Sequence, residues 1–142
     1  MIGIVLVSHG NLAPEALRSI ESVMGHGVPG VTAVRARMDD TLDALRERIR
    51  AAARAVDQGQ GTLILTDMYG DSATNISVAL ASSAHIEVLS GANMPIVIKA
   101  ISARHTMDLE GLAAFLVEYG RSHILRAGPG SRGGRPPPAG TP

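Results

Sequence analysis

Short apolar runs alternate along the chain with longer segments in which apolar residues recur every three or four positions. Residues 2–8, 31–37, 62–66 and 86–90 form the short runs, which are typical of buried strands. Helical spacing predicts helices that begin near residues 12, 40, 72, 94 and 108. This alternation favours an α/β fold, in which a mainly parallel sheet carries helices on both faces.

Polar residues at the expected helix starts indicate how those helices begin. Asp39 or Asp40 is the expected N-cap of the second helix, and Ser72 that of the third. Asn93 is expected to cap the fourth helix, with Pro95 in its first turn, and Asp108 starts the fifth. The loops at the carboxyl edge of the sheet, where such folds bind ligands, are then residues 9–11, 67–75 and 91–95.

The end of the chain departs from this pattern. Residues 123–127 (HILRA) are expected to form a last short strand, antiparallel to the others. From residue 128 onward the chain holds mainly Gly, Pro, Ser and Arg without an apolar pattern, which is typical of a disordered tail or a linker. We therefore expect one domain over residues 1–127 and a tail over residues 128–142.

Composition narrows the classes of function. The chain of 142 residues has 13 Lys and Arg against 13 Asp and Glu, and nucleic-acid or anionic-membrane binding would require a basic excess. The absence of cysteine excludes disulfides and thiolate metal sites. With no recognisable signal peptide and no apolar stretch of bilayer length, a cytoplasmic protein is expected.

His9 and Asp67 are the candidate chemical groups. His9 ends the first predicted strand and Asp67 follows the third. If these strands are neighbours, as in the common flavodoxin-like order, the two side chains lie within reach of each other. A neutral imidazole is nucleophilic, and a carboxylate that accepts from one ring nitrogen leaves the other nitrogen free to attack.

The start of the third helix would add a seat for an anion. Ser72 and the backbone N–H groups of Ala73 and Thr74 lie there, and a helix N-terminus attracts phosphate. Together with His9 and Asp67, they predict a phosphohistidine site. From spacing alone, the alternative is that His9 is a polar loop residue and that Asp67 and Ser72 only cap a helix.

Three segments carry a resemblance to a known family. They are VSHG at residues 7–10, TDMYGDSATN at residues 66–75 and GANMP at residues 91–95. In this order, the chain over roughly residues 1–127 resembles the mannose-type enzyme IIA domain of the bacterial phosphoenolpyruvate-dependent sugar phosphotransferase system. The resemblance implies a flavodoxin-like fold and a phosphotransferase. In it, His9 takes a phosphoryl group from the carrier HPr and passes it to an enzyme IIB for sugar uptake.

The resemblance also implies roles for other residues and for a second subunit. Asp67 would orient the histidine, and Ser72 would contact the phosphate. The domain would be a homodimer that exchanges its final strand, and it would meet the membrane only through a permease complex. The family usually shows Gly-Gly-Ser-Pro at residues 70–73, whereas this chain has Asp71, a negative charge beside the expected phosphate seat.

Five further residues are candidates for a surface that faces a partner. Arg35 and Arg37 end the second strand, and they are either solvated charges or contacts to an acidic partner or to the phosphoryl group. Met38, Met68 and Met94 would form an adaptable apolar rim. The remaining histidines show no metal-ligand spacing, so neither a metal nor another cofactor is expected.

Three other functions remain open at this point. The chain could be a regulatory phosphoacceptor without a direct role in transport, or the phosphoryl donor subunit of a dihydroxyacetone kinase. A third alternative is a small-molecule binding module of flavodoxin type. Against that module, the first loop lacks a Ser/Thr-rich phosphate nest, and the chain has only two Tyr, one Phe and no Trp to sandwich a ring.

Overall fold

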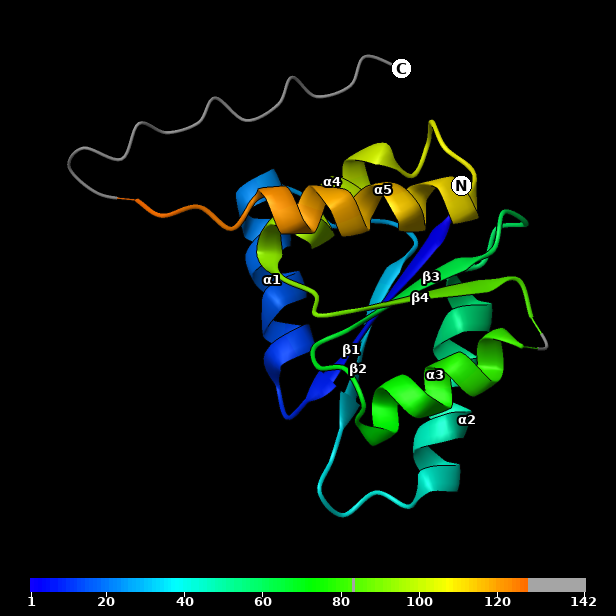
Figure 1. The fold of residues 1–142 in the computed structure, drawn as a ribbon. Coiled ribbons are helices and arrows are strands. Elements are labelled where there is room, and N and C mark those ends of the chain that lie inside the picture. Colours follow the sequence, from blue (N-terminus) through cyan, green and yellow to red (C-terminus); the bar gives the residue numbers. More distant parts are fainter. Residues whose placement is uncertain (83, 128–142) are drawn as a thin grey trace.

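Strands and helices alternate along the chain as the apolar pattern predicts. The computed structural model describes residues 1–82 and 84–127 (Figure 1). Its strands are β1 (Gly3–His9), β2 (Val31–Ala36), β3 (Thr62–Thr66) and β4 (Ile86–Ser90). Its helices are α1 (Leu12–Met24), α2 (Leu42–Val56), α3 (Ser72–Ala81), α4 (Met94–Ala103) and α5 (Leu109–Ser122). The predicted α/β class is confirmed.

The sheet is parallel throughout, with the strand order β2-β1-β3-β4. The chain winds outward from β1 in one direction to β2 and in the other through β3 to β4, so the switch point lies between β1 and β3. Val7 of β1 stands opposite Thr66 of β3, and His9 stands opposite Ala36 of β2. The adjacency that the His9–Asp67 prediction required is therefore present at the carboxyl edge.

Two apolar layers enclose the sheet. α1, α4 and α5 cover one face, and α2 and α3 cover the other (Figure 1). Successive residues of β1 serve alternate layers, since Ile4 and Leu6 pack in the first and Val5 and Val7 in the second. Burial of each such side chain stabilises the fold by about 1.5–3 kcal/mol. The strand ends that carry the site are thus anchored on both faces.

The start of α2 differs from the prediction. Thr41, rather than Asp39 or Asp40, is the N-cap, and its Oγ1 accepts from the Ala44 N–H at 3.1 Å. Asp40 has another use, because it accepts from the Arg37 N–H and forms an ion pair with Arg48. The connection from β2 into α2 is held by these contacts.

The start of α3 also differs, by one residue. Asp71 is the N-cap, with an extended backbone (φ −83°, ψ 174°) and an Oδ1 that accepts from the Thr74 N–H at 2.7 Å. Ser72, the expected cap, is already the first helical residue. The expected caps of α4 and α5, Asn93 and Asp108, are confirmed.

The predicted C-terminal strand is absent from the single chain. α5 ends at Ser122, and residues 123–127 form no strand. They lead away from the sheet (Figure 1), and a segment this short has no stability as a strand without a partner. Ile124 and Leu125 remain 78% and 61% exposed. The predicted tail, residues 128–142, lies outside the described residues.

Candidate functional site

His9 is the last residue of β1 and projects from the carboxyl edge of the sheet. The next residue, Gly10, has φ +53° and donates its N–H to the Ala36 carbonyl at 3.1 Å. The preceding Ser8 is buried, and its Oγ accepts from the Ala13 N–H at 2.6 Å, which ties the start of α1 to β1. The backbone of His9 is therefore fixed, whereas its side chain is 46% exposed.

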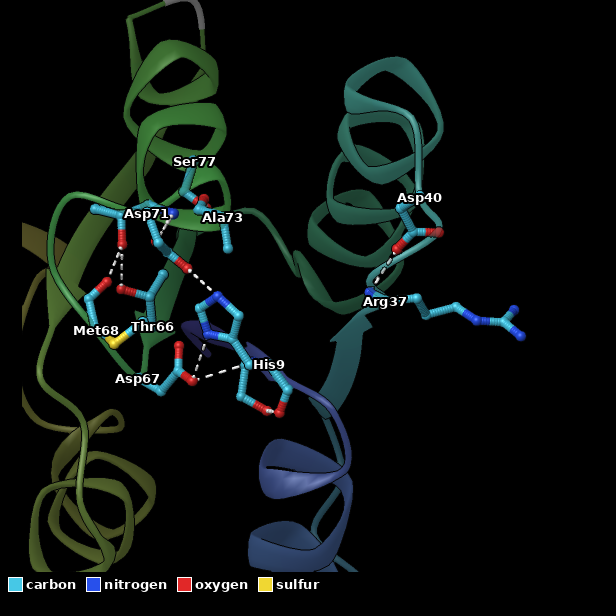
Figure 2. A network of polar contacts seen from close by, with 11 residues as sticks. His9, Arg37, Asp40, Thr66, Asp67, Met68, Asp71, Ala73 and Ser77 are labelled. Carbon is cyan, nitrogen blue, oxygen red and sulfur yellow. Dashed lines mark hydrogen bonds and ion pairs between the residues drawn. The ribbon is translucent and has the colours of Figure 1, made fainter.

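Asp67 holds one edge of the His9 ring. Its Oδ2 lies 3.0 Å from His9 Nδ1 and accepts from the His9 backbone N–H at the same distance (Figure 2). The hydrogen bond that His9 donates to Asp67 raises the pKa of His9 above its ordinary value; desolvation opposes this, and the charges of Asp67 and Asp71 add to it. A carboxylate in this position favours the Nδ1–H tautomer and directs Nε2 away from Asp67.

Asp71 faces the other edge of the ring. Its Oδ2 lies 3.4 Å from His9 Nε2, while its Oδ1 is engaged as the cap of α3 (Figure 2). The Asp71 side chain is only 8% exposed. The imidazole therefore lies between two carboxylates, one at each ring nitrogen. The charge that the sequence places beside the expected phosphate seat does face inward.

The first residues of α3 adjoin the histidine. Ser72 and Ala73 line a cleft of about 450 Å³ together with His9, and amides at a helix start have no intrahelical acceptor. Thr74 is used differently, because its N–H donates to Asp71 and its hydroxyl contacts Thr66 Oγ1 and the Met68 carbonyl. Of the three expected phosphate contacts, Ser72 and Ala73 thus border the open cleft, and Thr74 secures the loop.

The expected partner-facing residues occupy two sides of the site. Arg35 and Arg37 line the same cleft as His9. Met94 lines a second hollow of about 240 Å³ that Asp67 also borders. Met68 lies in the loop after β3 and is 52% exposed.

One wall of the cleft was predicted only at Met38. The connection from β2 to α2 lines it from Met38 to Leu42, and Met38 is fully exposed. The signal for this wall was the pair of arginines at the end of β2, which the connection follows directly. The role of Asp71 as a helix cap was also missed, although Asp is as good an N-cap as Ser.

One group of described residues has the ligand spacing of a metal site. Single ligand atoms of His9, Asp67 and Asp71 lie within 4.8 Å of one another. The two carboxylates, however, contact different ring nitrogens, so one ion could not replace both contacts. The arrangement is better explained as a histidine held by two carboxylates.

The comparison with known families gives a match over most of the chain. The family model EIIA-man, described as the PTS system fructose IIA component, matches residues 3–117. The chain belongs to this family. The resemblance expected from the three loop segments is confirmed, and the chain is a IIA component of the mannose and fructose type.

Curated members of the EIIA-man family align with nearly the whole chain. The mannose-specific EIIAB component of Escherichia coli K12 is 29% identical over 99% of this chain and 45% of its own length, so the chain spans less than half of that relative. The fructose-specific EIIA component of Bacillus subtilis is 23% identical over 79% of this chain and 77% of its own length.

Solved structures share the fold. The EIIA component from Streptococcus agalactiae superposes with a TM-score of 0.80 at 25% identity, over 89% of this chain and 97% of its own. The mannose/sorbose IIA subunit from Enterococcus faecalis has the same TM-score at 23% identity, over 90% and 96% of the two chains, and this supports the fold. Within residues 1–82 and 84–127, no helix is both long and apolar enough to cross a membrane.

Proposed function

We propose that this EIIA-man family member is a phosphocarrier in sugar uptake. His9 accepts a phosphoryl group from an HPr-type protein and passes it to an enzyme IIB partner. The observation that carries the proposal is the pair of contacts at Asp67, which fix both the backbone and the ring of His9 at 3.0 Å. A ring held through Nδ1 presents Nε2 as its reactive atom.

The transfer itself needs little more than this geometry. As Nε2 forms its bond to phosphorus, the bond between phosphorus and the donor's nitrogen breaks, and the donor keeps that electron pair. The ring becomes cationic, and the adjacent Asp67 carboxylate stabilises it. The amides of Ser72 and Ala73, at the start of α3, donate to the phosphoryl oxygens. No metal or other cofactor takes part in this scheme.

The surroundings of His9 support protein partners. Arg35 and Arg37 supply positive charge in the cleft, and Met68 and Met94 supply apolar contacts nearby. Positive charge beside the histidine would attract an acidic patch of a partner and the phosphoryl group in transit. The relative from Escherichia coli is an EIIAB component, which supports an enzyme IIB as the receiving partner.

The direct test is phosphorylation by the upstream proteins. The purified chain is incubated with phosphoenolpyruvate, enzyme I and HPr, and its intact mass is measured. We expect the mass to rise by one phosphoryl group, and His9→Ala to abolish the rise without unfolding the protein, since the side chain is 46% exposed. His26→Ala, at another exposed histidine, is the matched control. Phosphoryl uptake that persists in His9→Ala would refute the proposal.

The receiving protein is identified in a second step. The phosphorylated chain is mixed with an enzyme IIB or with a dihydroxyacetone kinase, and loss of its phosphoryl group is followed by mass. Fast transfer to enzyme IIB supports transport. Transfer to the kinase alone would replace transport by the donor-subunit function, and transfer to neither would favour a regulatory phosphoacceptor.

We also propose a homodimer that uses the C-terminal segment. Ile124 and Leu125 are largely exposed in the single chain, and β2 and β4 are the edges of its sheet. Pairing of residues 123–127 with an edge strand of a neighbouring subunit would bury both features. Sedimentation of the intact chain and of a chain cut before Ser122 tests this. A monomeric intact chain refutes the dimer, and a dimer that survives the cut places the interface elsewhere.

A further inference from the structure

We propose that Asp71 is a second working carboxylate of the site, which takes the Nε2 proton of His9 as the phosphoryl group arrives and returns it as the group leaves. The proposal rests on the phosphocarrier function proposed above. It concerns the carboxylate that faces Nε2 of His9 from the start of α3.

The position of Asp71 is the first argument. Its Oδ1 is anchored by the Thr74 N–H at 2.7 Å, so its Oδ2 is directed at the His9 ring, 3.4 Å from Nε2 (Figure 2). This Oδ2 is buried and has no hydrogen-bond partner among the described residues. A buried carboxylate oxygen without a donor is costly. A proton on Nε2 supplies that donor.

The protonation of His9 is the second argument. When both ring nitrogens carry protons, Nδ1–H donates to Asp67 and Nε2–H points to Asp71, and the cation lies between two negative charges. In this cationic form Nε2 carries a proton and has no free lone pair, so it is not nucleophilic. Phosphoryl acceptance from this form therefore requires that the Nε2 proton leave, and Asp71 Oδ2 is the carboxylate oxygen placed to receive it.

The step balances in protons and electrons. The Nε2–H bond breaks and its proton moves to Asp71 Oδ2, while the electron pair released on Nε2 forms the bond to phosphorus. The donor's bond between nitrogen and phosphorus breaks, and its electron pair stays on the donor nitrogen. On transfer to the next protein, the Nε2–phosphorus pair returns to Nε2, and this nitrogen takes back the proton from Asp71.

The proton transfer also removes a charge conflict. A phosphoryl group on Nε2 would stand directly beside the ionised Asp71 carboxylate, and two negative charges at such a distance repel each other. The protonated carboxyl group is neutral and has an O–H that donates to a phosphoryl oxygen. Asp71 in this form stabilises the phosphorylated state that its ionised form would oppose.

Other ionisable groups border the same cleft. Arg35, Arg37, Asp39 and Asp40 come from the end of β2 and the connection to α2. Asp40 is not a competing base, because hydrogen bonds from Arg48 and from the Arg37 N–H lower its pKa to about 2. Asp67, at the end of β3, is committed to Nδ1 and to the His9 backbone.

The alternative role of Asp71 is that of a helix cap only. The fold itself shows that a cap here needs no charge, because Asn93 caps α4 with the same geometry, its Oδ1 accepting from the Ile96 N–H at 3.0 Å. Asp71→Asn should therefore keep the cap of α3 and remove only the proton acceptor. Asp71→Ser, a second capping residue, removes it with a different side chain.

The experiment measures the initial rate of phosphoryl acceptance from phosphorylated HPr, by intact mass, between about pH 5.5 and pH 8.5. The rate of the wild-type chain should change little over this range. Asp71→Asn and Asp71→Ser should be slowed by about 10²-fold at the acidic end and approach the wild-type rate toward the alkaline end, as more of His9 loses its Nε2 proton to solvent.

The matched control is Asp108→Asn. Asp108 caps α5 in the same way, its Oδ1 accepting from the Gly111 N–H at 2.8 Å, but it does not line the cleft of His9. This variant should keep the wild-type pH profile. Thermal unfolding of all variants checks that each is folded.

The outcomes separate this inference from the proposed function. A wild-type chain that accepts no phosphoryl group at any pH refutes the phosphocarrier function, and the role of Asp71 falls with it. A wild-type chain that accepts, together with Asp71→Asn at the wild-type rate throughout, refutes only the proton transfer and leaves Asp71 as a cap. Faster acceptance by Asp71→Asn at every pH would show that the carboxylate obstructs transfer, which also overturns the inference.

Discussion

Asp67 and Asp71 contact the same imidazole, but the chain holds them in different ways. Asp67 directly follows β3, and its Oδ2 holds the Nδ1 atom and the backbone N–H of His9 at 3.0 Å. Asp71 belongs to the start of α3, commits Oδ1 to the Thr74 N–H, and faces Nε2 with Oδ2 at 3.4 Å. The first carboxylate is placed by the register of two buried strands, and the second by a local turn.

This difference indicates that the two carboxylates have separate roles: Asp67 orients the His9 ring, and Asp71 exchanges a proton with it. A carboxylate with two short contacts to one residue fixes that residue, whereas a longer contact to the opposite nitrogen leaves room for the proton to move. Asp67 therefore belongs to the frame that makes His9 a nucleophile, and removing it should cost more than removing Asp71.

Asp67→Asn should slow phosphoryl acceptance by about 10³- to 10⁴-fold, comparable with replacement of the aspartate in a serine triad. The asparagine amide can donate to Nδ1, and this favours the tautomer that carries its proton on Nε2. Single-turnover transfer from phosphorylated HPr, followed by intact mass at neutral pH, measures the rate.

Two results would contradict this assignment. Undiminished transfer in Asp67→Asn would mean that Asp67 does not orient the ring. If phosphoryl acceptance by the wild-type chain required a divalent ion and was abolished by a chelator, the group of His9, Asp67 and Asp71 would be a metal site instead. The control is again Asp108→Asn, which leaves both ring contacts in place.

The titration of His9 distinguishes the two carboxylates without any transfer. The hydrogen bond to Asp67 is the largest cause of the raised pKa of His9, and the charge of Asp71 is the smallest. Asp67→Asn should therefore lower the pKa of His9 more than Asp71→Asn does. NMR titration of the ring measures both, and an equal or reversed order would contradict the ranking.

The same shift fixes the sign of a pH effect on stability. Because the pKa of His9 is raised by folding, protonation of His9 favours the folded state below the unfolded pKa, and this contribution is lost as pH rises through the folded pKa. The melting temperature of Asp67→Asn should thus fall further below that of the wild type at about pH 5.5 than at about pH 8.5.

The sequence predicts the position of Asp67 more securely than that of Asp71, because a strand places the first and a local turn places the second. Buried parallel strands are read from apolar runs, and a residue at the end of such a run lies at a known edge of the sheet, so His9 and Asp67 could be paired in advance. Asp71 and Ser72 are neighbouring residues with equal capping ability, and only the structure shows which one precedes the first helical turn.

The C-terminal segment is the other region whose structure the sequence did not predict. Residues 123–127 have the composition of a strand, but a strand exists only where an edge is available to pair with it. In the single chain α5 leads this segment away from both edges of the sheet (Figure 1). The apolar pattern within the segment does not show whether such an edge lies beside it. The strand was therefore predicted from composition but does not form in the single chain.

The smallest effect we expect is a difference in stability between two variants that each lose an aspartate N-cap. The two aspartates, Asp71 and Asp108, make the same kind of hydrogen bond to a backbone N–H three residues further on. Asp71→Ala and Asp108→Ala each remove one N-cap, a loss of about 1 kcal/mol in the free energy of unfolding. Asp71 differs because its Oδ2 is buried without a hydrogen-bond donor when His9 is neutral, and Asp71→Ala relieves that cost. We therefore expect Asp71→Ala to destabilise the chain less than Asp108→Ala at about pH 8.5, and the gap to close at about pH 5.5, where cationic His9 pairs with Asp71. Urea unfolding of both variants at the two pH values measures this difference. Equal losses at both would show that Asp71 and His9 do not interact in the folded chain.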